Sequence, residues 1–144
     1  MTATVFVLNG PNLNLLGTRE PDIYGANTLA DIEAMLEDKA KRLGLAIDFR
    51  QTNHEGVLVD WLHEADAAGA KAVLLNAAAY THTSIALLDA IKAIGVPVIE
   101  VHLSDPVTRE EFRHTSYVGM AAIDEVKGMG GPGYAVALEK AAAL

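Results

Sequence analysis

Short apolar runs without polar alternation constrain the fold of this chain more than any other feature of its sequence. Residues 4–8, 72–75 and 98–101 are aliphatic, β-branched or aromatic, with Glu100 as the one charged member. Strands that are buried on both faces of a parallel sheet have this pattern, whereas a strand with one face in water alternates apolar and polar residues. We therefore predict that the three runs are inner strands of a parallel sheet.

Segments in which apolar residues recur at helical spacing separate these runs. We predict four helices, over residues 28–43, 55–68, 84–94 and 133–143, and two further strands, over residues 45–51 and 121–126. The last strand is the least apolar, because it contains Asp124 and Glu125. Strands that alternate with helices indicate an α/β fold, a doubly wound parallel sheet in three α/β/α layers. Five strands fit the flavodoxin-like order.

The length and composition of the chain favour a single globular domain over residues 1–144. Of its 144 residues, 51% are hydrophobic and 21% are charged, which is ordinary for such a domain. We find neither a stretch long enough to span a bilayer nor a basic, apolar leader, so we expect a cytoplasmic protein without a membrane partner. The formal net charge of -8 argues against a nucleic-acid partner, although local cations can still bind a small anionic substrate.

The segment between the first predicted strand and the first predicted helix is unusually long. Such connections usually take about two to six residues, and longer ones are often lids or binding loops. Residues 9–25 present Asn12, Arg19 and Tyr24 among prolines and glycines that can fix and hinge the backbone. We predict an active-site lid. The alternative is a structural Ω-loop packed by its leucines, Leu13, Leu15 and Leu16.

The polar residues best suited to binding and catalysis follow the ends of the predicted strands. In an open α/β sheet, ligands bind beyond the carboxyl ends of the strands, where the loops meet. We therefore expect one site at this edge, built from Asn12, Arg19, Tyr24, Asn53, His54, Asn76, His82, His102, Ser104 and Arg113.

Two pairs of residues have the chemistry of a general base and a general acid. A guanidinium within about 4 to 6 Å lowers the pKa of a phenol, so Arg19 would make Tyr24 a usable base. Otherwise Tyr24 is an ordinary packed loop tyrosine. Glu100 and His102 stand two residues apart at a strand end, so both project to one face, where the carboxylate can fix the imidazole tautomer and favour its charged form. The alternative is a structural ion pair.

The sequence favours a site without metal or cofactor. Asn76 and His82 bracket a loop before a helix amino end, which would suit a carboxylate ligand. His82 has no ligand-type neighbour at i+3 or i+4, and the chain has no HExxH signature and no cysteine. Residues 128–133 match GxGxxG, but the strand and the acidic residue that a dinucleotide site needs do not follow.

Four motifs follow one another over nearly the whole chain: NGPNLNLLGTREPDIYG, QTNHEGVLVDWLHEA, NAAAYTHTSIALLDA and EVHLSDPVTREEFRHTSY. Together they resemble type II 3-dehydroquinate dehydratase. The resemblance implies a lyase that dehydrates 3-dehydroquinate to 3-dehydroshikimate by anti elimination through an enolate, in the shikimate pathway of aromatic amino acid biosynthesis. It also implies a flavodoxin-like fold, no cofactor, and a homo-oligomer that is a dodecamer built from trimers.

The resemblance assigns roles to residues by their place in these motifs. Tyr24 would remove the C2 proton, with Arg19 lowering its pKa. His102 would protonate the departing C1 hydroxyl, with Glu100 orienting it. Asn12 would hold a water on the enolate oxygen. The other residues would bind substrate: Asn76 and the backbones of Leu103 and Ser104 at the carboxylate and neighbouring groups, His82 and Arg113 at ring hydroxyls, and Asp89 in an adjacent subunit's site.

The chain departs from the family pattern after Ser104. Asp105, Pro106 and Val107 stand where the family usually has asparagine, an apolar residue and often histidine. An extra carboxylate there could weaken the binding of an anionic substrate. The main alternative function is a flavodoxin-like small-molecule binding or regulatory module without catalysis, although the acidic cluster of receiver domains is missing.

Overall fold

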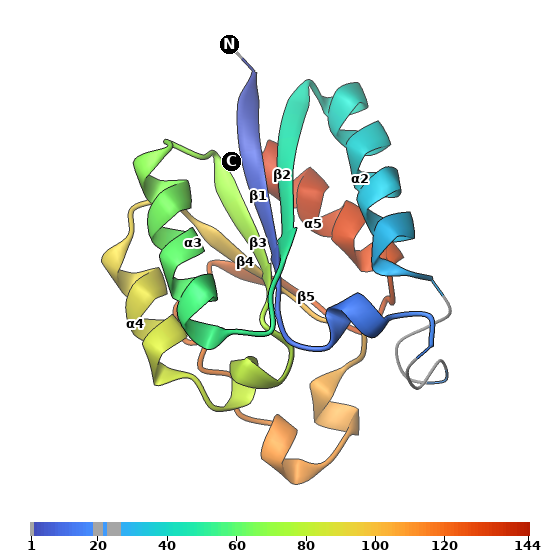
Figure 1. The fold of residues 1–144 in the computed structure, drawn as a ribbon, viewed down its shortest axis with the longest axis vertical. Helices are drawn as coiled ribbons and strands as arrows, with labels where there is room; N and C mark the ends of the chain where they lie inside the picture. The colour runs from blue at the N-terminus through green and yellow to red at the C-terminus, as the bar shows by residue number, and fades with distance from the viewer. Residues whose placement is uncertain (1, 19–21, 23–26) are drawn as a thin grey trace.

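The computed structural model of the chain describes residues 2–18, 22 and 27–144 and contains a five-stranded parallel sheet (Figure 1). Its strands are β1 (Ala3–Asn9), β2 (Leu45–Gln51), β3 (Ala72–Asn76), β4 (Val98–Val101) and β5 (Asp124–Val126). They lie in the order β2-β1-β3-β4-β5, and every neighbouring pair is parallel. The predicted α/β fold and its flavodoxin-like strand order are therefore confirmed.

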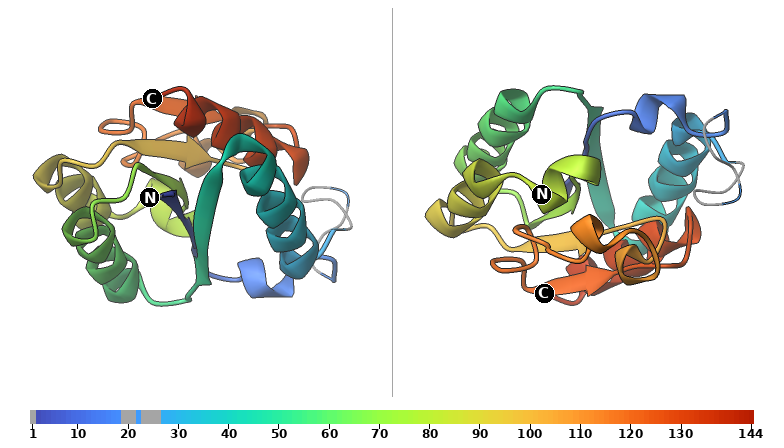
Figure 2. Two further views of the ribbon diagram at one scale, coloured as in Figure 1. Left: turned by 90° about the horizontal axis from the view of Figure 1, so that it is seen from above. Right: turned by 90° about the horizontal axis from the view of Figure 1, so that it is seen from below.

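In the described part of the chain, four α-helices cover the two faces of the sheet (Figure 2). Helices α2 (Leu29–Leu43) and α5 (Pro132–Ala142) pack on one face, and α3 (Glu55–Ala67) and α4 (Ile85–Ala93) pack on the other. Successive residues of β1 alternate between two buried apolar clusters, with Val5 and Val7 in one and Phe6 and Leu8 in the other. The three predicted layers follow from this alternation.

Capping residues fix where the helices begin and end. Thr28 and Asp31 form a reciprocal capping box at the start of α2, with N–H to side-chain oxygen distances of 3.0 and 3.1 Å. Gly44 ends the same helix with φ of 72°, a left-handed conformation that favours glycine. The Ser84 hydroxyl accepts the Leu87 N–H at 2.9 Å and begins α4. The sequence predicted all three helix ends.

The last strand is shorter than predicted. β5 does not extend to residue 121, because the N–H groups of Ala121 and Ala122 both donate to the Val118 carbonyl in a turn. The segment after β4 forms two 3-10 turns, η3 (Pro106–Thr108) and η4 (Glu111–Arg113). Two more such turns, η1 (Leu13–Leu15) and η2 (Ala78–His82), follow β1 and β3. Tight turns therefore surround the carboxyl edge of the sheet.

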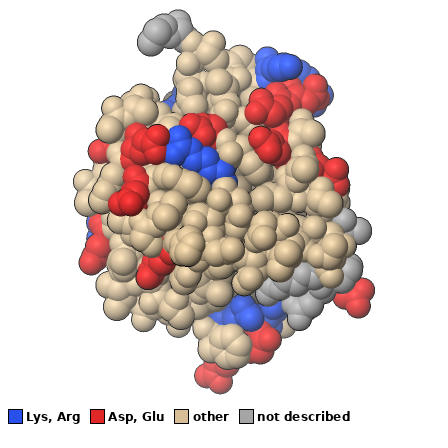
Figure 3. Space-filling view, in the orientation of Figure 1, with Lys and Arg blue, Asp and Glu red and all other residues tan. Residues whose placement is uncertain are grey.

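Charged side chains on the face drawn in Figure 3 occur as mixed groups of both signs. Arg50, for example, binds Asp48 at 2.8 Å and Glu64 at 2.5 Å, and these hydrogen bonds raise the pKa of the guanidinium and lower that of Glu64. Within the described ranges, no helix is both long enough and apolar enough to cross a membrane.

Candidate active site

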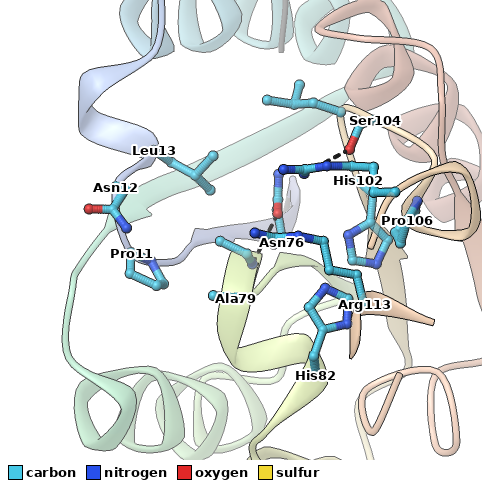
Figure 4. A pocket seen from close by; sticks show the side chains of 13 residues that line it. Pro11, Asn12, Leu13, Asn76, Ala79, His82, His102, Ser104, Pro106 and Arg113 are labelled. Atoms are coloured by element: carbon cyan, nitrogen blue, oxygen red, sulfur yellow. Dashed lines mark hydrogen bonds between the residues drawn. The ribbon is translucent and has the colours of Figure 1, made fainter. Parts of the chain in front are cut away.

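A pocket lies at the carboxyl edge of the sheet, between the turns that follow β1, β3 and β4 (Figure 4). Its wall contains the following residues of the predicted site: Asn12, Asn76, His82, His102, Leu103, Ser104 and Arg113. The turns bring them together from three segments that are far apart in the sequence. The pocket therefore lies where the sheet topology predicts a ligand site.

A buried hydrogen-bonded group supports the wall of this pocket. Glu100, in β4, is 2% exposed, and its Oε2 lies 2.5 Å from His102 Nε2. The Ser116 hydroxyl donates to the same oxygen at 2.6 Å. A carboxylate inside an apolar strand is costly unless it is paired, and these two donors pair it. The spacing of two residues puts Glu100 and His102 on one side of the strand, as the sequence predicted.

The contacts of Glu100 set its charge and the orientation of His102. Burial acts to raise the pKa of Glu100, but the hydrogen bonds from His102 and Ser116 and the nearby imidazoles outweigh it and hold that pKa below its ordinary value. Glu100 is therefore ionised near neutral pH. Because Glu100 occupies Nε2 of His102, Nδ1 is the ring nitrogen that is left for a ligand.

His82 lies beside His102 in the pocket wall (Figure 4). The two rings are stacked with centroids 6.4 Å apart and planes 15° apart. His82 Nδ1 donates to the Thr115 carbonyl oxygen at 2.8 Å, and burial lowers the pKa of this imidazole. A neutral His82 then presents Nε2 as an acceptor, which suits a hydroxyl group of a ligand.

Two guanidinium groups lie in the pocket wall of a chain whose formal net charge is -8. Arg113 Nε donates to Glu110 at 2.6 Å, and Arg109 Nη1 donates to the Ser104 hydroxyl at 3.3 Å. The sequence did not single out Arg109. It lies in the same segment after β4 as four predicted site residues, His102, Leu103, Ser104 and Arg113, and that position was the available signal. The N–H groups of a guanidinium can donate to oxygens of a ligand.

The carboxylate of Asp105, which departs from the family pattern, contacts groups that do not line the pocket. Its Oδ1 accepts the Val107 N–H at 3.1 Å and lies 4.0 Å from Lys127 Nζ. Pro106, rather than Asp105, lines the pocket. The expected repulsion between this carboxylate and an anionic ligand is therefore reduced by an N–H donor and a lysine.

Neighbours from the end of β2 hold Asn12 at the base of the first loop. Asn12 has φ of 68°, and its N–H donates to Asn53 Oδ1 at 3.0 Å. Gln51 Nε2 donates to the same oxygen and to the Gly10 carbonyl, both at 3.2 Å. Asn53 thus holds the backbone of Asn12 in place. Neither it nor His54, which precedes α3, lines the pocket, although both lie in the loop after the carboxyl end of β2, as predicted.

The leucines of the first loop divide between the core and the surface. Leu13 and Leu16 are buried in the core beside α2, whereas Leu15 is 49% exposed. Two of the three leucines are therefore packed, as the Ω-loop alternative required, and Leu15 is not; Asn12 and Leu13 also line the pocket. The structure supports both a structural and a site-forming role for this segment.

The remaining predicted site residues are Arg19, Tyr24 and Asp89. Arg19 and Tyr24 lie outside the described residues, so their pairing stays a prediction. Asp89 is exposed on α4 and does not line the pocket. Among residues 2–18, 22 and 27–144, no three His, Cys, Asp or Glu side chains form a group that could hold a metal ion.

Comparisons with known proteins agree with the fold and with the family that the sequence motifs resemble. The family model of dehydroquinase class II matches residues 3–142. The 3-dehydroquinate dehydratase of Acidovorax ebreus (strain TPSY) is 61% identical, covering 96% of this chain and 97% of that protein. The crystal structure of type II dehydroquinase from Propionibacterium acnes has a TM-score of 0.95 and 42% identity, covering 100% of this chain and 99% of that one. The type II dehydroquinase from Butyrivibrio crossotus also has a TM-score of 0.95, with 36% identity and 97% of both chains covered. This chain belongs to the class II dehydroquinase family.

Proposed function

We propose that this protein is a hydro-lyase that converts 3-dehydroquinate to 3-dehydroshikimate in the shikimate pathway. The observation that carries the proposal is the buried Glu100 carboxylate, 2.5 Å from His102 Nε2, behind a pocket that also holds Arg109 and Arg113. The substrate has a carboxylate, ring hydroxyls and a ketone. The pocket offers the Asn76 amide and the backbones of Leu103 and Ser104 for the carboxylate, and the neutral His82 imidazole and the Arg113 guanidinium for the hydroxyls.

The reaction is an elimination of water next to a ketone. A base takes the proton from C2, and the electron pair of that C–H bond forms an enolate. The pair then becomes the C1–C2 double bond while the C1–O bond breaks and the oxygen leaves as water. We assign Tyr24 as the base, with Arg19 favouring its phenolate. His102 donates a proton from Nδ1 to the leaving C1 hydroxyl. Glu100 accepts a hydrogen bond from Nε2 of the same ring and stabilises the charged imidazole.

The remaining groups bind the substrate and the enolate. We assign Asn12 to a water that donates to the enolate oxygen, since such a donor stabilises the charge that develops there. The substrate-binding groups are Asn76 and the backbones of Leu103 and Ser104 at the carboxylate and its neighbours, and His82 and Arg113 at the ring hydroxyls. The neutral state of His82 supports its assignment, because Nε2 can accept a hydrogen bond from a ring hydroxyl.

We further propose that the chain acts as a single catalytic domain in a cytoplasmic dodecamer built from trimers. In this assembly Asp89 reaches the site of an adjacent subunit. Its exposure on α4 supports the assignment, since the side chain is accessible to another chain. Sedimentation of the purified protein tests the assembly, and a monomer would contradict it.

Mixing the purified protein with 3-dehydroquinate tests the activity. The product contains a conjugated enone, so ultraviolet absorbance should grow with time. A His102→Gln variant should be slower by about 100-fold or more, because a general acid contributes about this much. A folded wild-type protein that produces no absorbance change would refute the dehydratase and favour a binding module.

A further inference from the structure

A buried chain of hydrogen bonds links Asn76, in the pocket wall, to helix α5. Asn76 Nδ2 donates to the Tyr134 hydroxyl oxygen at 2.8 Å, and this hydroxyl donates to Asn9 Oδ1 at 2.7 Å. Asn9 Nδ2 donates to the Arg50 carbonyl oxygen at 2.9 Å. At the other end, the Ala78 N–H donates to Asn76 Oδ1 at 3.2 Å. The chain therefore connects the ends of β1, β2 and β3 with α5.

Backbone groups at the two ends fix the direction of every bond in this chain. The Ala78 N–H can only donate, so the oxygen of the Asn76 amide must face it and the nitrogen must face Tyr134. The Arg50 carbonyl can only accept, so Asn9 must turn its nitrogen to Arg50 and its oxygen to Tyr134. The Tyr134 hydroxyl must therefore accept from Asn76 and donate to Asn9.

Tyr134 is suited to this task because it is fully buried and stays protonated. The residue is 0% exposed, and burial raises the pKa of its phenol. A neutral hydroxyl supplies one acceptor for the N–H of Asn76 and one donor for the amide oxygen of Asn9, both at a fixed place. The second N–H of Asn76 Nδ2 is then left for a ligand on the pocket side.

We propose that Tyr134 is a positioning residue of this site, which holds the Asn76 amide so that an N–H, and not the carbonyl oxygen, meets an acceptor oxygen of the substrate. The proposal rests on the proposed function, in which Asn76 binds substrate. Tyr134 does not line the pocket, so it acts only through Asn76. Without its hydroxyl, Asn76 keeps only the bond from Ala78, and its N–H loses a fixed direction.

A double-mutant cycle with Tyr134→Phe and Asn76→Ala tests the proposal. Steady-state rates with 3-dehydroquinate give kcat and KM for each variant. Tyr134→Phe should raise KM and lower kcat/KM about 10-fold, because one oriented hydrogen bond is weakened. Its effect on kcat should be smaller, since the substrate carboxylate carries the same charge in the ground state and in the transition state. In the Asn76→Ala background, the same change should cost less than about twofold.

A matched control separates positioning from a general loss of packing. Leu138→Ala, in the same helix, removes buried apolar atoms without a hydrogen-bonding group and should lower the melting temperature with KM unchanged. If Tyr134→Phe does not fold, Asn9→Ala replaces it, because it removes the acceptor that fixes the direction of the Tyr134 hydroxyl; KM should rise again.

Three results would contradict these expectations, and they are distinguishable. An unchanged KM in a folded Tyr134→Phe protein would overturn the positioning role. So would an equal loss of kcat/KM with and without Asn76. A wild-type protein that is folded but inactive would instead refute the proposed function on which this role rests.

Discussion

Replacing Glu100 by glutamine separates the charge of this residue from its hydrogen bonds. Oε2 accepts from both His102 and Ser116, at 2.5 and 2.6 Å, whereas Oε1 has no hydrogen-bond partner among the described residues. A glutamine can place its carbonyl oxygen where Oε2 lies and its amide nitrogen where Oε1 lies. Both hydrogen bonds then persist to a neutral acceptor, and no two donors face each other.

The loss of charge should be visible in kcat. A hydrogen bond to a charged group contributes about 1.5–3 kcal/mol, against about 1 kcal/mol for a neutral pair. Charged His102 therefore loses about 0.5–2 kcal/mol of stabilisation in Glu100→Gln, which corresponds to about 2- to 30-fold in rate. The rate of enone absorbance at saturating 3-dehydroquinate measures this effect.

A matched variant and the fold control complete this test. Ser116→Ala removes the other donor and keeps the carboxylate, so its kcat should fall less than that of Glu100→Gln. Circular dichroism checks that both variants are folded. If folded Glu100→Gln turned over at the wild-type rate, the carboxylate would have no part in stabilising the acid, and this reasoning would be refuted.

Further predictions concern the same group and the first loop. The pKa of Glu100 in the folded protein lies below its ordinary value of 4.5, so ionised Glu100 stabilises the fold above pH 4.5. This contribution is lost as the pH falls through the folded pKa. Thermal unfolding should therefore show that Glu100→Gln loses less stability in acid than the wild type. Gly119→Ala would put a Cβ 2.8 Å from Glu100 Oε1 and 2.9 Å from the Ser116 hydroxyl, so kcat should fall; a wild-type rate would mean that the pair tolerates displacement. Arg19→Ala should shift the basic group's limb of the pH–rate profile upward, toward the free phenol of Tyr24, and an unchanged profile would contradict their coupling.

Much of the fold could be predicted because its determinants are local. The apolar runs of β1, β3 and β4 are buried on both faces, and Thr28, Gly44 and Ser84 act within one turn of the helix ends that they fix. The length of β5 could not be predicted in the same way. Among the described strands, this edge strand pairs with β4 alone, and two of its three residues are exposed, so its own side chains specify it weakly.

In the candidate site, too, the features with local determinants could be predicted and the others could not. The pairing of Glu100 with His102 could be predicted, since a spacing of two residues in a strand determines the common face. The bonds of Tyr134 to Asn76 and Asn9 join residues 58 and 125 positions apart, and no local pattern indicates them. The contribution of Arg109 likewise depends on two 3-10 turns that orient the segment after β4.

A crystal structure with a bound cyclohexane-based analogue of 3-dehydroquinate tests the central claim most directly. An anti elimination requires the base and the acid on opposite faces of the ring. We expect the Tyr24 phenol at the C2 face and His102 Nδ1 toward the C1 oxygen on the other face. Both groups on one face, or His102 beyond hydrogen-bonding reach of that oxygen, would contradict the proposed mechanism.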